Sequence, residues 1–162
     1  MQKRTSAGTS INSAKLPRIY TVLKNQMNGH TFVDYGCGRY TDHIAEHVES
    51  IGGTVRFFDP YNQPEAVNNA TLNAGKADFA VCSNVLNVID SDDAVRDCIK
   101  NALELGCGLA YFTVYEGDKS GKGAETQQGK SWQRNAPIRA YAQFAPDGCA
   151  VTFKSGVMII SK

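Results

Sequence analysis

The sequence predicts a three-layer α/β sandwich whose sheet is mainly parallel and ends in an antiparallel hairpin. Two observations predict it. Short apolar runs alternate with segments of helical period between Thr31 and Tyr115, which is the order of strand and helix that places helices on both faces of a parallel sheet. The final apolar runs, 150–154 and 157–161, are separated only by Ser155-Gly156, a two-residue turn typical of a hairpin.

Chain length and local composition predict the domain organisation. With 162 residues the chain can bury one core and is short for two ordinary domains. Residues 1–13 are rich in Ser, Thr, Gly and Asn, so we expect a flexible amino-terminal segment there. Residues 14–162 are then expected to form a single domain.

The first half of the chain shows two helices and two strands. Apolar residues in the first segment fall on one helical stripe, with Pro17 near its start and Gly29 just past its end. A β run then leads into a glycine turn, a second helix follows, and Gly52-Gly53 separates that helix from the next β run. The expected elements are helix 15–28, strand 31–34, helix 40–51 and strand 54–58.

The second half continues the alternation. Residues 61–76 are weakly patterned and hold either a short helix or a third edge strand. Ser91-Asp92-Asp93 predicts a helix start, because small oxygen-bearing side chains satisfy free amide groups, and Gly106 ends that helix. The other expected elements are strand 78–82, strand 108–115, a loop over 117–135, a short helix over 135–141 and the terminal hairpin.

Composition excludes several classes of function. The formal charge of +1, from 17 basic and 16 acidic residues, gives no bulk attraction to nucleic acid or to a membrane surface. The five cysteines form no C-x-x-C pair, so we expect reduced thiols in a cytoplasmic protein. No apolar stretch has the length of a signal peptide core or a membrane span, so we expect no membrane association. The oligomeric state is left open, with a homodimer as one option.

The turn after the first strand is the most informative motif. Asp34 ends the strand and Gly36-Cys37-Gly38 follows, but the third glycine of the dinucleotide pattern G-x-G-x-x-G is missing. Glycines at such a turn let a ligand approach the backbone closely. An acid placed before the turn repels a pyrophosphate and attracts an ammonium group.

These residues resemble the first motif of the class I, Rossmann-like, S-adenosylmethionine-dependent methyltransferases, an acid, one residue, then Gly-x-Gly. The resemblance extends over about Thr31 to Tyr115 and is closest to small methyltransferase-like proteins of phages and bacteria. It implies S-adenosylmethionine as cofactor, with Asp34 near the methionine amino group and Asp59 accepting both ribose hydroxyls. The cofactor-binding residues that it implies are Asp34, Tyr35, Gly36, Cys37, Gly38, Asp59, Pro60, Ser83 and Asn84.

Methyl transfer needs alignment and exclusion of water more than any single catalytic group. Asn84 and Asn87 follow the strand that ends near Cys82, and Glu116 follows the next strand, so these three are the catalytic candidates. Tyr115, Trp132 and Arg134 combine aromatic rings with a cation and are the substrate-binding candidates. The acceptor is a small molecule or a nucleic acid that the sequence does not identify.

Alternatives remain at several positions. The glycine turn could be a tight connector without ligand, which would leave both acids unexplained. Trp132 and Arg134 could staple a loop, and the Ser83–Asn87 segment could serve only in capping and turns. His43 and His47 spell H-x-x-E-H with Glu46, but the spacing supplies no third ligand, so no metal is expected. A binding protein without methyl transfer and an NAD-dependent oxidoreductase are the competing functions.

Overall fold

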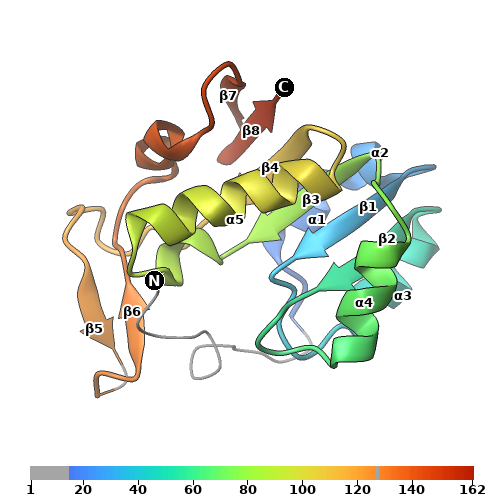
Figure 1. Ribbon diagram of the computed structural model, residues 1–162, viewed down its shortest axis with the longest axis horizontal. Coiled ribbons are helices and arrows are strands. Elements are labelled where there is room, and N and C mark those ends of the chain that lie inside the picture. Colours follow the sequence, from blue (N-terminus) through green and yellow to red (C-terminus); the bar gives the residue numbers. More distant parts are fainter. Residues whose placement is uncertain (1–14, 127) are drawn as a thin grey trace.

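The computed structural model describes residues 15–126 and 128–162, so the expected flexible segment 1–13 lies outside the described residues. Its main sheet has six strands in the order β2-β1-β3-β4-β8-β7 (Figure 1). The first four pair in parallel, while β8 is antiparallel to both β4 and β7. The strands are β1 (Thr31–Tyr35), β2 (Thr54–Phe58), β3 (Phe79–Ser83), β4 (Leu109–Thr113), β7 (Ala150–Lys154) and β8 (Val157–Ser161). The predicted fold class, a mainly parallel sheet with a carboxy-terminal hairpin, is confirmed.

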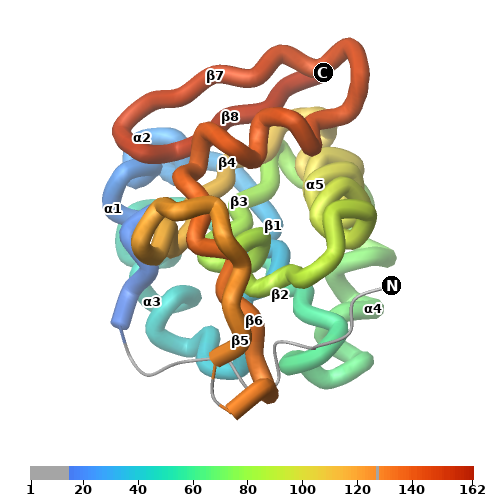
Figure 2. Tube along the Cα trace, turned by 90° about the vertical axis from the view of Figure 1, so that its left-hand side faces the viewer, coloured from blue at the N-terminus to red at the C-terminus, as the bar shows by residue number. Residues whose placement is uncertain are grey.

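Helices cover both faces of the sheet and complete the three layers. Figure 2 shows α1, α2 and α3 on one side of the strands and α4 and α5 on the other. Their bounds are α1 (Arg18–Val22), α2 (Lys24–Met27), α3 (Asp42–Ser50), α4 (Glu65–Asn73) and α5 (Asp92–Leu105). Two 3₁₀ segments, η2 (Leu86–Val88) and η3 (Ile138–Phe144), complete the helical elements of the described residues.

Alternation along the strands divides the core into two clusters. In β3, Phe79 and Val81 pack with α1, α2 and α3, whereas Ala80 and Cys82 pack with α5. Side chains point alternately to the two faces of a strand, and a strand with both faces covered is apolar throughout. Within the described residues no helix is long and apolar enough to cross a membrane.

The structure differs from the sequence prediction in the first helix and in the loop over 117–135. The expected first helix is divided at Leu23, whereas the short helix expected as one option within 61–76 is confirmed as α4. The expected loop over 117–135 is wrong in part, because β5 (Ala124–Thr126) and β6 (Ser131–Gln133) form an antiparallel pair there. Strands of three residues lie below the length at which period-two patterning becomes visible.

The free edge of β2 is capped by side chains of α4. The Asn68 amide donates to the carbonyl of Asp59 and accepts from its backbone N–H, at 3.1 and 2.8 Å. Thr71 Oγ1 donates to the carbonyl of Phe57 at 2.7 Å. Unpaired strand groups are thereby satisfied, and the chain that leaves β2 is held at Asp59.

We expect Asn68→Ala to lower the free energy of unfolding by about 2 kcal/mol, because two buried backbone groups of Asp59 lose their partner. Urea unfolding measures the change. Asn69→Ala is the matched control, since Asn69 is exposed on the same helix and the substitution raises helix propensity equally. Equal unfolding free energies for the two variants would contradict a capping role for Asn68.

Candidate functional site at the carboxyl ends of the parallel strands

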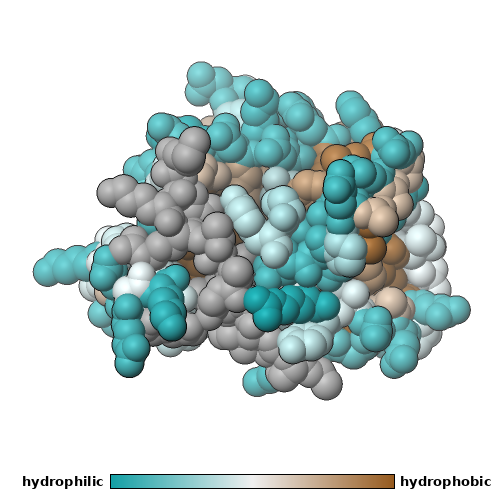
Figure 3. Space-filling view, turned by 60° about the horizontal axis from the view of Figure 1, so that its bottom comes forward, coloured by the Kyte–Doolittle hydropathy of each residue, from teal (hydrophilic) through white to brown (hydrophobic). Residues whose placement is uncertain are grey.

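In the sheet, β1 lies between β2 and β3, so the strand order reverses at β1. Ligands of open parallel sheets bind beyond the carboxyl ends of the strands at such a switch in strand order. The loops that follow β1, β2, β3 and β4 all begin at that edge. Figure 3 brings the underside of Figure 1 forward, and hydrophilic side chains predominate at the centre of that face among the residues described.

Asp34 lies at the end of β1, 3% exposed, on the α1 side of the sheet. Tyr20 of α1 donates its hydroxyl hydrogen to Asp34 Oδ2 at 2.5 Å. Burial raises the pKa of Asp34 to about 7, the Tyr20 hydrogen bond opposes that rise, and the nearby charge of Asp59 adds to it. The Asp34 carboxyl therefore takes up or releases a proton near neutral pH.

Asp59 directly follows β2 and is 4% exposed. Its Oδ2 accepts from the Gly38 N–H and from the Asn62 side-chain amide, both at 3.0 Å. Its Oδ1 accepts from the backbone N–H groups of Tyr61 and Asn62 at 2.9 and 3.0 Å. A carboxylate offers about four lone-pair positions, so these donors occupy all of them. Asp59 thus joins the glycine turn after β1 to the turn that follows β2.

The glycine turn has left-handed backbone at both glycines, with φ of 80° at Gly36 and 77° at Gly38. A side chain on Gly36 would collide with Val85 of the loop after β3, so Gly36 is also required by packing. The side chain of Tyr35 points to the α5 face, where its ring stacks on Phe58 at 5.1 Å. Of the predicted cofactor-binding residues in this region, Cys37 is half-buried and Pro60 is exposed.

The loop after β3 is tied to β4 and to β6. Ser83 Oγ lies 3.0 Å from Thr113 Oγ1, and the Asn84 N–H donates to the carbonyl of Thr113. Asn84 is exposed and has φ of 57°, a conformation that asparagine tolerates better than most residues. Three of the predicted residues, Ser83, Asn84 and Tyr115, therefore lie at adjoining strand ends.

A relay of amides connects this loop to the end of β4. Asn87 Nδ2 donates to Gln133 Oε1 at 3.0 Å, and Gln133 Nε2 donates to the carbonyl of Tyr115 at 3.0 Å. The sequence analysis missed Gln133 as a partner of Asn87, because it expected a loop there and no strand that would fix the position of Gln133. Tyr20 was also missed, since its position on the helical stripe indicated a core residue.

Glu116, a catalytic candidate, is engaged in local structure. Its Oε1 accepts from the Ile138 N–H at 2.8 Å, and its Oε2 forms an ion pair with Lys119 at 2.9 Å. The Ile138 hydrogen bond, followed by the contact with Lys119, lowers the pKa of Glu116. A carboxylate with a lowered pKa is a weaker base, so these contacts argue against Glu116 as a proton acceptor. Its catalytic role stays a prediction.

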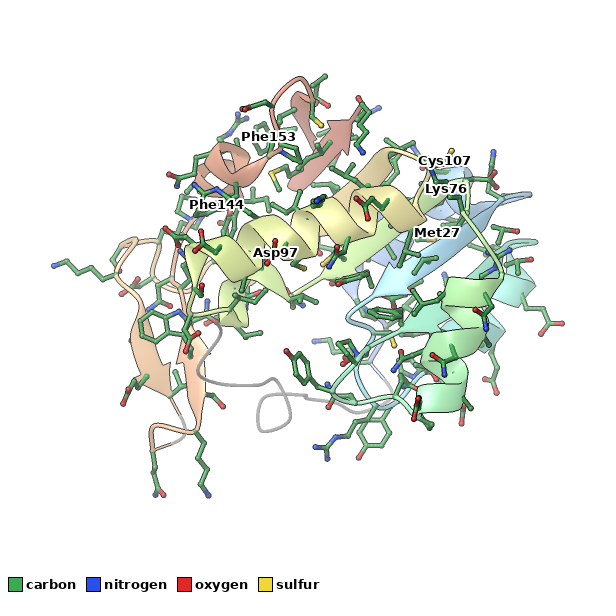
Figure 4. The ribbon with its side chains drawn as sticks, viewed as in Figure 1. Met27, Lys76, Asp97, Cys107, Phe144 and Phe153 are labelled. Atoms are coloured by element: carbon green, nitrogen blue, oxygen red, sulfur yellow. The ribbon has the colours of Figure 1, made fainter. Side chains whose placement is uncertain are left out.

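The substrate-binding candidates in and directly after β6, Trp132 and Arg134, have partners within the chain. Arg134 Nη1 forms an ion pair with Asp92 at 2.7 Å, and Nη2 donates to the carbonyl of Ile89. Its guanidinium also lies over Phe144, which Figure 4 shows on η3 beside α5. Trp132 packs against Gly123 across the β5–β6 pair. These contacts favour the interpretation that Arg134 holds β6 against the start of α5 and has a structural role, rather than binding substrate.

We expect Arg134→Ala to lower the free energy of unfolding by about 1 to 2 kcal/mol, because a largely buried guanidinium loses its ion pair, a carbonyl partner and an aromatic contact. Arg96→Ala is the matched control, since Arg96 also lies over Phe144 but is half-exposed and pairs only with its helix neighbour Asp93. The midpoints of thermal unfolding of the two variants give the comparison. Equal stabilities of the two variants would show that Arg134 does not hold β6 in place and would favour its availability to substrate.

No group of three or more metal-ligating side chains occurs among residues 15–126 and 128–162. His43 and His47 lie half-buried on α3, where the His47 ring meets the Tyr20 ring edge-on at 6.4 Å. The cysteines are free thiols, and burial raises the pKa of Cys37.

The comparisons with known proteins found likeness only among solved structures. No protein-family model and no curated protein matches the sequence. An O-methyltransferase from neocarzinostatin biosynthesis, NcsB1, in complex with S-adenosyl-L-homocysteine, is similar over 91% of this chain, with 16% identity and a TM-score of 0.48. The chain spans 57% of the length of NcsB1. DhpI, in complex with S-adenosylhomocysteine, is similar over 88% of this chain and 82% of its own, with 12% identity and a TM-score of 0.44.

Proposed function

We propose that this chain is an S-adenosylmethionine-dependent methyltransferase whose cofactor lies at the ends of β1 and β2. One observation carries the proposal. Two buried acids, Asp34 and Asp59, end neighbouring parallel strands at the switch in strand order, and the Gly36–Gly38 turn lies between them. Carboxylates so placed suit a ligand with a cation at one end and a diol at the other.

The donor set of the site fits the two ends of this cofactor, which supplies a methyl group on a cationic sulfur. Asp34 carries a pKa of about 7, so a neighbouring ammonium group would favour its ionised form. The acceptor positions of the Asp59 carboxylate are all filled by donors of the chain. Ribose hydroxyls would replace one of these donors, the Asn62 side-chain amide on Oδ2. That exchange keeps the carboxylate satisfied, because hydroxyls are donors as well.

The acceptor would bind beside the loop after β3 and the end of β4. Asn84 and Asn87 are the candidates for orienting it, and Tyr115 is 64% exposed there. The chain's own residues would align the acceptor and exclude water, which supply most of the acceleration in a displacement of this kind. A small molecule and a nucleic acid both remain acceptors under this proposal.

Cofactor binding without methyl transfer is the second candidate function. The contacts of Glu116 favour it, because they leave the nearest carboxylate at the end of β4 a weak base. Release of S-adenosylhomocysteine from S-adenosylmethionine, measured with small-molecule and nucleic-acid pools, separates the two functions.

We expect S-adenosylhomocysteine to raise the midpoint of thermal unfolding, whereas NAD should leave it unchanged. A ligand at about 100 times its dissociation constant stabilises the folded state by about 2.7 kcal/mol. Asp59→Asn should abolish most of this shift, because it replaces one acceptor oxygen with a donor. Asp78→Asn is the matched control, since Asp78 accepts from the Thr31 N–H at the opposite end of the sheet. Stabilisation by NAD alone would overturn the proposal in favour of an oxidoreductase.

A further inference from the structure

The hydrogen-bond partner of Asp34 is a tyrosine that other rings hold in place. Tyr20 lies on α1 and is fully buried. Its ring centroid lies 6.2 Å from that of Phe32 in β1, and His47 of α3 meets the ring edge-on at 6.4 Å. These contacts fix the direction of the Tyr20 hydroxyl group, whose oxygen lies 2.5 Å from Asp34 Oδ2. Helix α1 thereby orients an acid that belongs to β1.

The two oxygens of the Asp34 carboxyl have different surroundings. Oδ2 accepts the Tyr20 hydrogen bond, whereas Oδ1 has no hydrogen-bond partner among the described residues. Oδ1 is not one of the buried polar atoms that lack a partner, so it keeps some exposed surface although Asp34 is only 3% exposed. An open carboxylate oxygen without a partner is a position at which an N–H donor of a ligand can bind.

The hydrogen bond from Tyr20 also bears on the charge of Asp34. The titratable groups that act on each other here are Asp34, Tyr20 of α1, Asp59 after β2, Cys37 of the glycine turn and Cys82 of β3. None of these partners of Asp34 is a cation. Burial and the charge of Asp59 raise the pKa of Asp34, and the Tyr20 hydrogen bond is the contact that opposes them.

From this geometry we infer that Tyr20 is a positioning residue of the cofactor site, which holds Oδ2 of Asp34 and leaves Oδ1 as the acceptor for the ammonium group of the ligand. Without the Tyr20 hydroxyl, the carboxyl stays buried and loses the contact that favours its ionised form. The inference rests on the proposed function, because the group that Oδ1 accepts from is the amino group of S-adenosylmethionine.

Tyr20→Phe tests the inference, because it removes one oxygen and keeps the buried ring. Loss of the hydrogen bond raises the pKa of Asp34 further, so less of the carboxyl is ionised at a given pH. We expect the variant to bind S-adenosylhomocysteine about tenfold more weakly than the unsubstituted protein at pH 6, and the two affinities to converge by about pH 9. The ionisation of the ligand is common to both proteins, so the ratio of their affinities isolates Asp34.

Two controls separate this effect from a loss of structure. 5′-Methylthioadenosine has the adenosine and the sulfur of the cofactor but no amino acid, so Tyr20→Phe should leave its affinity nearly unchanged. Tyr141→Phe removes the same atom from another fully buried tyrosine, which lies in the other core cluster and whose hydroxyl has no partner among the described residues. This variant should bind S-adenosylhomocysteine as the unsubstituted protein does at every pH.

The unsubstituted protein gives a second measurement that needs no folded variant. The pKa of Asp34 is about 7, so the preference for S-adenosylhomocysteine over 5′-methylthioadenosine should fall about tenfold between pH 8 and pH 6. The ¹³C signal of the Asp34 carboxyl reports its ionisation without any ligand. In Tyr20→Phe this signal should titrate at a pH about one unit higher.

The outcomes separate the inference from the proposed function. If S-adenosylhomocysteine binds but Tyr20→Phe weakens it by the same factor at every pH, or weakens 5′-methylthioadenosine equally, Tyr20 supports only the fold and the inference is overturned. A preference between the two ligands that stays constant from pH 8 to pH 6 would overturn it as well. If neither ligand binds the unsubstituted protein at millimolar concentration, the proposed function fails and the inference fails with it.

Discussion

Asp34→Asn is expected to become more stable relative to the unsubstituted protein as the pH rises from about 4 to 7. The pKa of Asp34 is about 7 in the folded chain and 3.8 in its ordinary state, so folding favours the protonated carboxyl. Below the ordinary pKa both states hold the proton and the penalty is absent. As the pH rises toward 7 the unfolded chain is already ionised, and stability falls by on the order of 4 kcal/mol.

Urea unfolding of both proteins across this pH range measures the effect. Asparagine at position 34 has nearly the same shape, keeps an acceptor for the Tyr20 hydroxyl and does not ionise. All other titrating groups are common to both proteins, so the difference between the two profiles isolates Asp34. Parallel profiles would mean that Asp34 has an ordinary pKa and is not in the buried environment described.

Asp59→Ala is expected to lower the free energy of unfolding by about 3 kcal/mol, because four donors lose their acceptor at once. They are the Gly38, Tyr61 and Asn62 backbone N–H groups and the Asn62 amide. Asp59 joins two strand ends, so its loss should also make the glycine turn more mobile. Denaturant unfolding gives the first effect and amide hydrogen exchange at Gly38 gives the second.

Asp118→Ala serves as the control for this substitution. Asp118 accepts from the Ser120 N–H in an exposed turn, and its loss should leave global stability nearly unchanged. Asp59→Asn should cost about half as much as Asp59→Ala, because its remaining oxygen still serves two donors. If alanine and asparagine at position 59 were equally well tolerated, the carboxylate would not organise the turn.

Periodicity and turn chemistry predicted most of the fold. Strand β2 and both strands of the terminal hairpin have the predicted bounds, and Ser91 is the N-cap of α5, its hydroxyl accepting from the Ala94 N–H. Such elements are specified by local pattern and by capping residues. The β5–β6 pair was missed because its two strands have three residues each, and because β6 lies against η2, a contact that local pattern does not reveal.

The candidate site could be predicted in position but not in its contacts. The two acids and two glycines are visible as residue types at strand ends, and the parallel sheet brings them together. That Tyr20 would hold Asp34, or that Asp59 would be filled by its own turn, depends on side chains from other elements. A glycine turn without ligand had left both acids unexplained, and these contacts within the chain now explain them. A test of the cofactor proposal must therefore measure binding directly.

Calorimetric titration of S-adenosylhomocysteine is that test, with the unsubstituted protein, Asp59→Asn and Asp78→Asn compared at neutral pH. The account predicts saturable binding by the unsubstituted protein, the same affinity for Asp78→Asn, and affinity lower by about 1 to 3 kcal/mol for Asp59→Asn. Absence of binding at millimolar ligand, or equal affinity of all three proteins, would contradict it.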